Sequence, residues 1–537
     1  MKMTQWLTFF VLIQIIYFLS TWKLYLKSGK KAWEALIPIY NAIELMKIIN
    51  RPKWWVILLF IPIINLIMFP VIWVETIRSF GKNTTIDTWL AILTFGFYIT
   101  YVNYNSDKLT YIKDRSLKPK TEVGEWISSI LFAIVAATLV HTYVMQPYTI
   151  PSSSLEKTLL VGDFLFVSKF HYGARVPMTT IALPMFHDSI PLLNIKSYLF
   201  SDDFSKKKTS LLNKLQLPYF RIPGFQKIKR NDIVVFNQPA DTLLDMNDFH
   251  PDRNYYKPID KKTNLVKRCV GIPGDSLEIR DGYIFINGVR TVLPERAKPQ
   301  YNFFINTEGR SINQISLVNR YGAREGLKYR NGDYALTNNG GYRLTLTDNE
   351  AKRIAKNPNV KGVVKMFEKP KGVDGGVFPH IPSLGWNIDN FGPIYIPQKG
   401  KTVKLDKRSL PFYKRIIQEY EKNNLIINGD EILINDKQVD SYTFKQDYFW
   451  MMGDNRQNSL DARFWGYVPF DHVVGKPVLI WFSWNTDGKG INKIRWDRMF
   501  TTVGGDRQPK SYFIYFIVAL VIYIGFYEFK KIKNKRS

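Results

Sequence analysis

The chain contains a single cysteine, Cys269, among its 537 residues. One thiol excludes an internal disulfide framework and leaves the redox compartment open. The sequence also lacks the H-E-x-x-H and C-x-x-C spacings of zinc sites, so we expect no metal and no other cofactor. No zinc-finger spacing and no run of five basic residues occurs before the C-terminal tail. Binding to nucleic acid is therefore not expected, although the formal net charge is +28.

What the sequence has instead is long apolar runs. Hydrophobic residues make up 46% of the chain and aromatic residues 15%, which suits both a packed core and a bilayer interface. A helix needs about 20 apolar residues to cross a bilayer. Five uncharged stretches reach or approach this length, at residues 4–22, 54–74, 88–103, 126–146 and 511–527. The second contains Pro62, Asn65 and Pro70, which predicts a kinked or partly re-entrant segment.

Basic residues orient these stretches, because lysine and arginine gather in cytoplasmic loops. Seven lie between the first and second stretches and five between the third and fourth, but only two between the second and third. The pattern predicts an outer N-terminus, an outer region over residues 147–510 and a cytoplasmic tail, KKIKNKRS. The alternative is that residues 1–22 are a cleaved secretory signal. Only Lys2 precedes the apolar run, however, and no A-x-A-like site follows it.

The outer region has a different sequence pattern from the apolar stretches. Segments 163–170, 231–238, 264–272 and 477–484 are short, partly alternating and rich in β-branched and aromatic residues, which predicts a mainly β region. Asp281-Gly282 and Gly429-Asp430 each separate two apolar arms and predict hairpins. Helical spacing occurs at 351–357 and 410–423, inside a lysine- and glycine-rich segment, 301–440. We interpret that segment as a large insertion on the β core.

These boundaries give six regions. They are an N-terminal membrane region (1–123), an anchor helix (124–146), a first part of the β core (147–300), the insertion (301–440), a closing part of the core (441–510), and a C-terminal span with its basic tail (511–537).

Three adjacent serines, Ser152, Ser153 and Ser154, follow the fourth apolar stretch and lead into an apolar strand pattern. Serines beside a span are, taken alone, typical of a cap or turn. A serine hydroxyl becomes a good nucleophile only when a base removes its proton. Histidine is the usual base, and spacing alone does not exclude the six histidines of this chain.

Lysine is the other candidate base. With a reference pKa of about 10.4, only about one lysine in 2,500 is neutral at pH 7, and a pKa near 7 needs a shift of about 3 units, or about 4 kcal/mol. Desolvation can supply this shift, so the base should lie inside an apolar strand. Lys267 meets the condition in the stretch LVKRCVGI, whereas most other lysines lie in solvated stretches. A lysine on an ordinary edge strand remains the alternative.

Three blocks, in order, resemble the conserved boxes of bacterial type I signal peptidases (leader peptidases). The nucleophile box is similar to PSSSLEKTLLVGDFLFVSKFHYG (151–173), the lysine box to VKRCVGIPGDSLEIRDGYIFING (266–288), and the closing box to MMGDNRQNSLDARFWGYVP (451–469). RNDIVVFNQP (230–239) resembles the strand before the lysine box. The resemblance implies a signal-peptidase-like, mainly β catalytic region with a large α+β insertion, carried by the five predicted transmembrane helices. It also implies a membrane-bound serine endopeptidase that removes leader peptides after Ala-x-Ala-like sites.

Residue by residue, the resemblance implies that Ser154 is the nucleophile and Lys267 the general base. The Ser154 amide and the Ser152 hydroxyl are implied as the oxyanion hole, whose donors must be aimed where negative charge develops. Ser459 matches a serine that hydrogen-bonds the lysine and orients it. Shallow pockets for small side chains are implied at Ile150, Pro151, Leu155 and Val266. An ion pair and a wall-forming turn, both structural, are implied at Asp461, Arg463, Gly453, Asp454, Asn455 and Arg456.

Three positions depart from the family pattern. Leu155 stands where methionine is usual, which nearly conserves volume. Lys157 replaces a usual proline and Ala462 a usual serine. These changes concern local loop geometry and leave the Ser154–Lys267 pair intact.

The resemblance implies signal-peptide-bearing preproteins, the phospholipid bilayer and a nearby secretion translocon as partners. Eukaryotic and archaeal relatives have histidine where Lys267 stands, so a bacterial or organellar enzyme of the inner (cytoplasmic) membrane is expected. Trp481, Phe482 and Trp484 are predicted to dip into lipid. One rival, a self-cleaving Ser/Lys repressor, would need a DNA-reading helix-turn-helix, and a second, a non-catalytic membrane scaffold, is disfavoured because both reactive residues are present.

Overall fold

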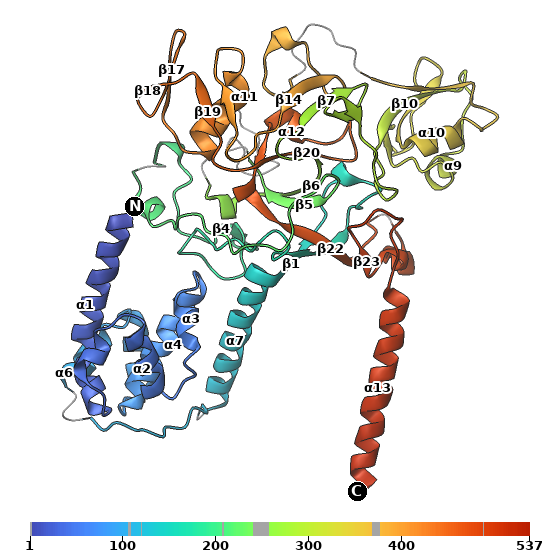
Figure 1. Cartoon of the computed structure of the whole chain (residues 1–537). Coiled ribbons are helices and arrows are strands. Elements are labelled where there is room, and N and C mark those ends of the chain that lie inside the picture. The colour runs from blue at the N-terminus through green and yellow to red at the C-terminus, as the bar shows by residue number, and fades with distance from the viewer. Residues whose placement is uncertain are drawn as a thin grey trace. The chain divides into compact units, whose positions relative to one another are not determined.

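The structure is a computed structural model that describes residues 3–105, 109–119, 121–206, 209–239, 257–367, 376–486 and 488–536. The chain forms two compact units (Figure 1). The first comprises Met1–Val144, Arg175–Ile222 and Asp241–Lys262, and the second comprises Met145–Ala174, Pro223–Ala240 and Thr263–Ser537.

The first unit is mainly helical. Its helices are α1 (Met3–Lys27), α2 (Tyr40–Ile48), α3 (Trp55–Leu59), α4 (Ile64–Ser79), α5 (Thr85–Leu93), α6 (Tyr98–Tyr104), α7 (Glu122–Leu139) and α8 (Leu211–Lys214), with a two-stranded pair of β3 (Ser189–Ile190) and β4 (Ile195–Lys196). Helices α1 to α6 enclose an apolar core that includes Leu24, Met46, Ile77 and Val102.

Three helical stretches are long and apolar enough to cross a membrane: Leu7–Lys27, Glu122–Val144 and Phe513–Ile532. They correspond to the first, fourth and fifth predicted spans. The five-span prediction is not confirmed, because the second and third spans are broken. In the second, α3 ends at Leu59 and α4 starts at Ile64, where Pro62 interrupts the helical hydrogen bonds and Ile63 has a φ of 72°.

The third predicted span is a bent pair of short helices. The chain bends by 118° between α5 and α6, and Phe95 and Gly96 at this bend have φ values of 51° and 84°. Such a pair is a broken span or a re-entrant loop. Within the described residues the chain therefore has three candidate spans, or up to four if this pair counts as one.

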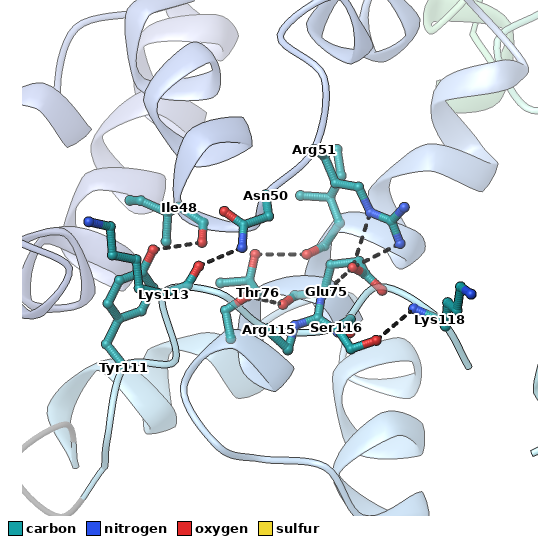
Figure 2. A network of polar contacts seen from close by, with 12 residues as sticks. Ile48, Asn50, Arg51, Glu75, Thr76, Tyr111, Lys113, Arg115, Ser116 and Lys118 are labelled. Atoms are coloured by element: carbon teal, nitrogen blue, oxygen red, sulfur yellow. Dashed lines mark hydrogen bonds and ion pairs between the residues drawn. The ribbon is translucent and has the colours of Figure 1, made fainter. Parts of the chain in front are cut away.

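Two basic loops of the first unit meet at one buried carboxylate (Figure 2). Glu75 on α4 is 7% exposed and accepts hydrogen bonds from Arg51 Nε and Nη2 at 3.2 and 3.1 Å. It also pairs with Arg115. Arg51 comes before α3 and Arg115 after α6, and the Tyr111 hydroxyl adds a 3.0 Å bond to the Ile48 carbonyl. Glu75 thus holds together the loops on either side of the two broken spans.

The second unit is built on an antiparallel sheet in the order β1-β2-β22-β5-β6-β20-β21, with β23 (Thr501–Thr502) paired to β22. The strands are β1 (Met145–Thr149), β2 (Asp163–Ser168), β22 (Val473–Ser483), β5 (Ile233–Asn237), β6 (Asn264–Gly271), β20 (Tyr448–Met452) and β21 (Val468–Pro469). Apolar clusters that include Leu165 and Val235, and Val234 and Met451, pack against its strands. The predicted mainly β region is confirmed.

Both predicted hairpins are present. Strands β7 (Ser276–Arg280) and β8 (Tyr283–Ile286) pair through a two-residue turn in which Asp281 and Gly282 have φ values of 48° and 75°. These strands form a sheet with β9 (Val289–Arg290) and β14 (Phe391–Tyr395). The second hairpin joins β16 (Leu425–Asn428) to β17 (Glu431–Ile434), and β18 (Lys437–Gln438) extends it.

The segment 301–440 consists of two different parts. Residues 301–365, which we call the 301–365 lobe, form a sheet in the order β11-β12-β10-β13 over their own apolar core. Its elements are β10 (Tyr301–Asn306), α9 (Gln314–Asn319), β11 (Glu325–Gly326), β12 (Gly341–Leu346), α10 (Asp348–Ile354) and β13 (Gly362–Lys365). The later part packs instead into the core around Leu277 and Trp450.

That later part contains α11 (Leu410–Arg415), which continues into a π-helical turn (Ile416–Tyr420), and β15 (Thr402–Lys404), which pairs with β19 (Ser441–Thr443). Helix α12 (Ala462–Trp465) follows β20, and α13 (Phe513–Arg536) ends the unit as one long helix.

Candidate active site

The structure brings Ser154 and Lys267 into direct contact. Ser154 lies in a short 3₁₀ turn (Ser153–Leu155) that follows β1, and Lys267 lies in β6. Lys267 Nζ donates a hydrogen bond to Ser154 Oγ at 2.5 Å, across 113 residues of sequence. Ser154 is 7% exposed and Lys267 4% exposed. A hydroxyl and an amine are therefore held together in a nearly water-free position.

Burial lowers the pKa of Lys267 from 10.5 to about 8. The charges of Asp461 and Asp454 act in the opposite direction, and that of Arg463 acts with burial. At a pKa of about 8, about one amine in ten is neutral at pH 7. Lys267 can therefore take a proton from Ser154 at ordinary pH, which the unperturbed amine rarely could.

Two buried ion pairs flank the amine. Arg268 Nε and Nη2 donate to the Asp454 oxygens at 2.7 and 2.6 Å, and the same atoms of Arg463 donate to Asp461 at 2.9 and 2.9 Å. Burial opposes ionisation of both acids, but the neighbouring arginines outweigh it and hold the pKa of Asp454 and of Asp461 below the ordinary value. Because each carboxylate is paired with an arginine, its pull on the Lys267 proton is partly offset, and the pKa of Lys267 stays below the ordinary value.

Ser459 lies beside the pair but does not bind the lysine. Its Oγ is buried and has no hydrogen-bond partner among the described residues, so the expected bond to Lys267 is not formed. The Lys267 amine binds Ser154 instead. A Cβ atom on Gly453 would lie 2.3 Å from Ser459 Oγ and 2.5 Å from the Ser154 carbonyl oxygen. Ser459 thus packs at the backbone of Ser154, and only glycine fits at position 453.

The turn after β20 binds the backbone of the nucleophile loop, by which we mean residues 152–158. Asn455 donates from its backbone N to the Ser154 carbonyl and from Nδ2 to the Ser153 carbonyl, both at 3.1 Å. Arg456, 2% exposed, donates from its backbone N to the Gln300 carbonyl at 3.1 Å. Contacts from this turn therefore fix the peptide groups on both sides of the candidate nucleophile.

The residues expected to form substrate pockets lie around Ser154. Ile150 and Leu155 are buried in one apolar cluster, and Val266 packs partly against it. Pro151 and Ser152 are exposed. Ile150 and Leu155 are thus core residues beneath Ser154, and the exposed chain next to it is Pro151 and Ser152.

Three supporting residues were missed from the sequence. Arg268 pairs with Asp454, the Thr158 hydroxyl donates to Asp454 at 2.6 Å, and Gln300 Nε2 donates to the Glu156 carbonyl at 3.0 Å. Only Arg268 carried a signal, because an arginine inside an apolar strand needs a buried carboxylate partner. In the part of the chain that the structure describes, no group of three His, Cys, Asp or Glu side chains could hold a metal ion.

Two family models match different parts of the chain. Residues 33–114 match a family of unknown function (DUF5684). Residues 123–323 and 393–484 match the family described as signal peptidase, peptidase S26.

Two individual signal peptidases also match much of the chain. A signal peptidase I from Buchnera aphidicola (subsp. Acyrthosiphon pisum) is 24% identical over 399 residues, covering 73% of this chain and 87% of the relative. One from Helicobacter pylori is 25% identical over 400 residues, covering 71% of this chain and 94% of the relative. A solved signal peptidase I from Enterococcus faecalis V583 is 14% identical, covers 47% of this chain and 97% of that chain, and has a TM-score of 0.15. Because the peptidase match spans more than half of the sequence and includes Ser154 and Lys267, the chain belongs to the signal peptidase family, peptidase S26.

Proposed function

We propose that this serine endopeptidase removes N-terminal leader peptides from exported preproteins, with Ser154 as nucleophile and Lys267 as general base. The activity follows from membership of the family. The observation that supports these two residues is the 2.5 Å contact between Lys267 Nζ and Ser154 Oγ, made by an amine whose pKa burial has lowered to about 8.

In the proposed mechanism, neutral Lys267 accepts the Ser154 proton as Oγ bonds to the scissile carbonyl carbon. The Ser154 amide and the Ser152 hydroxyl stabilise the oxyanion. The Lys267 ammonium then gives its proton to the leaving amine as the C–N bond breaks, which leaves an acyl ester on Ser154. Lys267 next takes a proton from water as the water oxygen attacks the ester carbonyl carbon. The bond between that carbon and Ser154 Oγ then breaks, the Lys267 ammonium returns its proton to Oγ, and the product acid leaves and gives its own proton to solvent.

The proposed substrate is an extended leader segment that lies along the exposed backbone at Pro151 and Ser152 and forms main-chain hydrogen bonds there. Ile150 and Leu155 are 3% and 0% exposed, so these core side chains leave little depth next to Ser154 for a substrate side chain. Limited depth favours small substrate side chains, which supports cleavage after Ala-x-Ala-like sequences.

An aromatic cluster supports contact between the second unit and lipid. Phe166 on β2 stacks on Trp481 of β22 at a ring-centroid distance of 5.6 Å, and Phe164 meets the same ring edge-on at 5.7 Å. The Phe482 ring lies 6.3 Å from the Trp484 ring. Trp484 is 38% exposed. Aromatic rings of this kind suit a membrane–water interface, where they would hold the site near the emerging cleavage sequence.

The proposed orientation needs only three crossings. Arg51 and Arg115 meet at Glu75, so the two basic loops lie on one side of the membrane and an even number of crossings separates them. With α3 to α6 not crossing fully, α1, α7 and α13 alone put the basic loops and the C-terminal tail in the cytoplasm. The N-terminus and the catalytic unit then lie on the outer face of the inner membrane, beside the exit of the secretion translocon.

The test uses the full chain in detergent or vesicles with a leader-bearing precursor. Ser154→Ala and Lys267→Ala should each abolish processing, whereas Ser153→Ala, which keeps the carbonyl that Asn455 binds, should retain it. Mass spectrometry of the new N-terminus identifies the cleaved bond. Processing that persists in Ser154→Ala or Lys267→Ala excludes the proposed mechanism.

A further inference from the structure

The family match stops at residue 323 and resumes at residue 393. The unmatched stretch includes most of the 301–365 lobe, and two carboxylates from this stretch reach the nucleophile loop. Glu350 on α10 pairs with Lys157, and the two side chains are 13% and 12% exposed. Lys157 is the position where the family usually has proline, and its φ of 70° is unusual for a residue with a side chain. A departure from the family pattern in the loop is thus matched by an ion pair from the lobe.

The second carboxylate reaches Ser154 through one intervening side chain. Glu325 on β11 accepts a hydrogen bond from Asn455 Nδ2 at 2.6 Å and another from Asn458 Nδ2. The same Asn455 Nδ2 binds the Ser153 carbonyl, and the Asn455 backbone N binds the Ser154 carbonyl, both at 3.1 Å. The Glu325 charge therefore fixes the orientation of the amide that holds the backbone of the candidate nucleophile.

A third contact comes from the residue just before the lobe. Gln300, fully buried, donates from Nε2 to the Glu156 carbonyl at 3.0 Å and from its backbone N to the Asp454 carbonyl at 2.8 Å. The lobe thus contacts the nucleophile loop directly at Lys157 and reaches Ser153 and Ser154 through Asn455, and Gln300 next to the lobe binds Glu156. A loop held at so many points loses little conformational entropy when substrate binds.

We propose that the 301–365 lobe positions the nucleophile loop, with Glu325 as a positioning residue for Ser154 and the Lys157–Glu350 pair as a second clamp. This inference rests on the proposed role of Ser154. A proline at position 157 would stiffen the loop locally. In this chain the ion pair between Lys157 and Glu350 of the lobe restrains the loop instead. Hydrogen bonds to a charged group are stronger than neutral ones, and small displacements of a nucleophile reduce catalysis steeply.

The test compares kcat and KM for a leader peptide in the full-length protein. Glu325→Ala should lower kcat about tenfold, as expected for loss of one charge-assisted hydrogen bond, and should leave KM nearly unchanged. Glu325→Gln, which keeps an acceptor for Asn455 but loses the charge, should recover part of kcat. Similarly, Lys157→Met should lower kcat, and Lys157→Arg, which keeps the ion pair, should restore it.

Glu308→Ala is the matched control, because Glu308 is an exposed carboxylate of the same lobe that lies outside the Glu325–Asn455 network. It should keep wild-type kcat. The pH at which kcat/KM levels off should not move in the Glu325 variants, since Lys267 is untouched. Wild-type kcat in Glu325→Ala, or an equal loss in Glu308→Ala, overturns the inference. Activity in Ser154→Ala would instead reject the proposed function itself, so the two failures are distinguishable.

Discussion

Lys267 and Arg268 are neighbours in β6 and both are buried, yet their surroundings differ in charge. Arg268 Nη2 lies 2.6 Å from Oδ2 of the Asp454 carboxylate. Among the described residues, Lys267 has no carboxylate within ion-pair distance, and its Nζ binds the Ser154 hydroxyl. Alternation along the strand sends the two side chains to opposite faces. One face therefore keeps a permanent cation, and the other holds an amine that can lose its proton.

The first prediction is that activity follows the ionisation of Lys267. Since only the neutral amine can act as base, kcat/KM for a leader peptide should rise about tenfold per pH unit below the Lys267 pKa and level off above about pH 8. Lys267→Arg should be inactive at every pH, because the guanidinium stays protonated. A pH profile that is already flat at pH 6 would contradict the assignment of the base.

A second prediction concerns stability. The pKa of Lys267 is about 8 in the folded protein and 10.5 as the reference value, so below pH 8 the folded state bears the full cost of a buried ammonium. The cost disappears as pH rises from 8 to 10.5, where the folded state has lost its proton and the unfolded chain still holds one. Lys267→Met removes this cost and should raise the free energy of unfolding at pH 7 by on the order of 3 kcal/mol.

Thermal unfolding of the detergent-solubilised chain measures this effect. The advantage of Lys267→Met should shrink between pH 8 and pH 10.5. Lys407→Met, at an exposed lysine, is the control and should show no such pH dependence. Equal stability of Lys267→Met and wild type at pH 7 would mean that the amine is not buried.

The sequence allowed prediction of features that depend on local pattern. The apolar neighbours of Lys267 predicted its burial, and Asp281-Gly282 predicted a hairpin because two consecutive residues with positive φ suit that dipeptide. Contacts across long loops could not be predicted in this way. Glu325 and Asn455 are 130 residues apart, and neither sits in a periodic pattern that would suggest a partner.

Two predictions were not confirmed, for physical reasons. The kink that Pro62 predicted in the second stretch is present at Ile63, but hydropathy does not register a backbone break, so the 118° bend between α5 and α6 in the third stretch was not predicted. The expected bond from Ser459 to Lys267 depended on side-chain direction, which a sequence pattern does not carry. In the structure, the Ser459 hydroxyl packs against Gly453 instead, 2.3 Å from the position that a Cβ atom on this glycine would occupy.

A third prediction tests the close packing at Gly453. An alanine methyl group there would lie 2.5 Å from the Ser154 carbonyl oxygen and 2.3 Å from Ser459 Oγ, so the nucleophile loop must shift. We expect Gly453→Ala to lower kcat about 100-fold, the scale of a misplacement of about 1 Å. Gly362→Ala, where a Cβ meets nothing within 4 Å, should keep full activity. Normal kcat in Gly453→Ala would show that the loop tolerates displacement.

The last prediction tests the three-crossing arrangement by cysteine labelling in spheroplasts. The native Cys269 is fully buried, so an introduced cysteine at an exposed position is the reactive thiol. If the broken helices α3 to α6 do not cross, Asn83→Cys between α4 and α5 should resist a membrane-impermeant maleimide added outside, as should Lys53→Cys in the first basic loop. Both should react after permeabilisation, whereas Lys407→Cys in the catalytic unit should react without it. Labelling of Asn83→Cys from outside would require two further crossings and restore the five-span topology, because the Glu75 network keeps both basic loops on one side in either case.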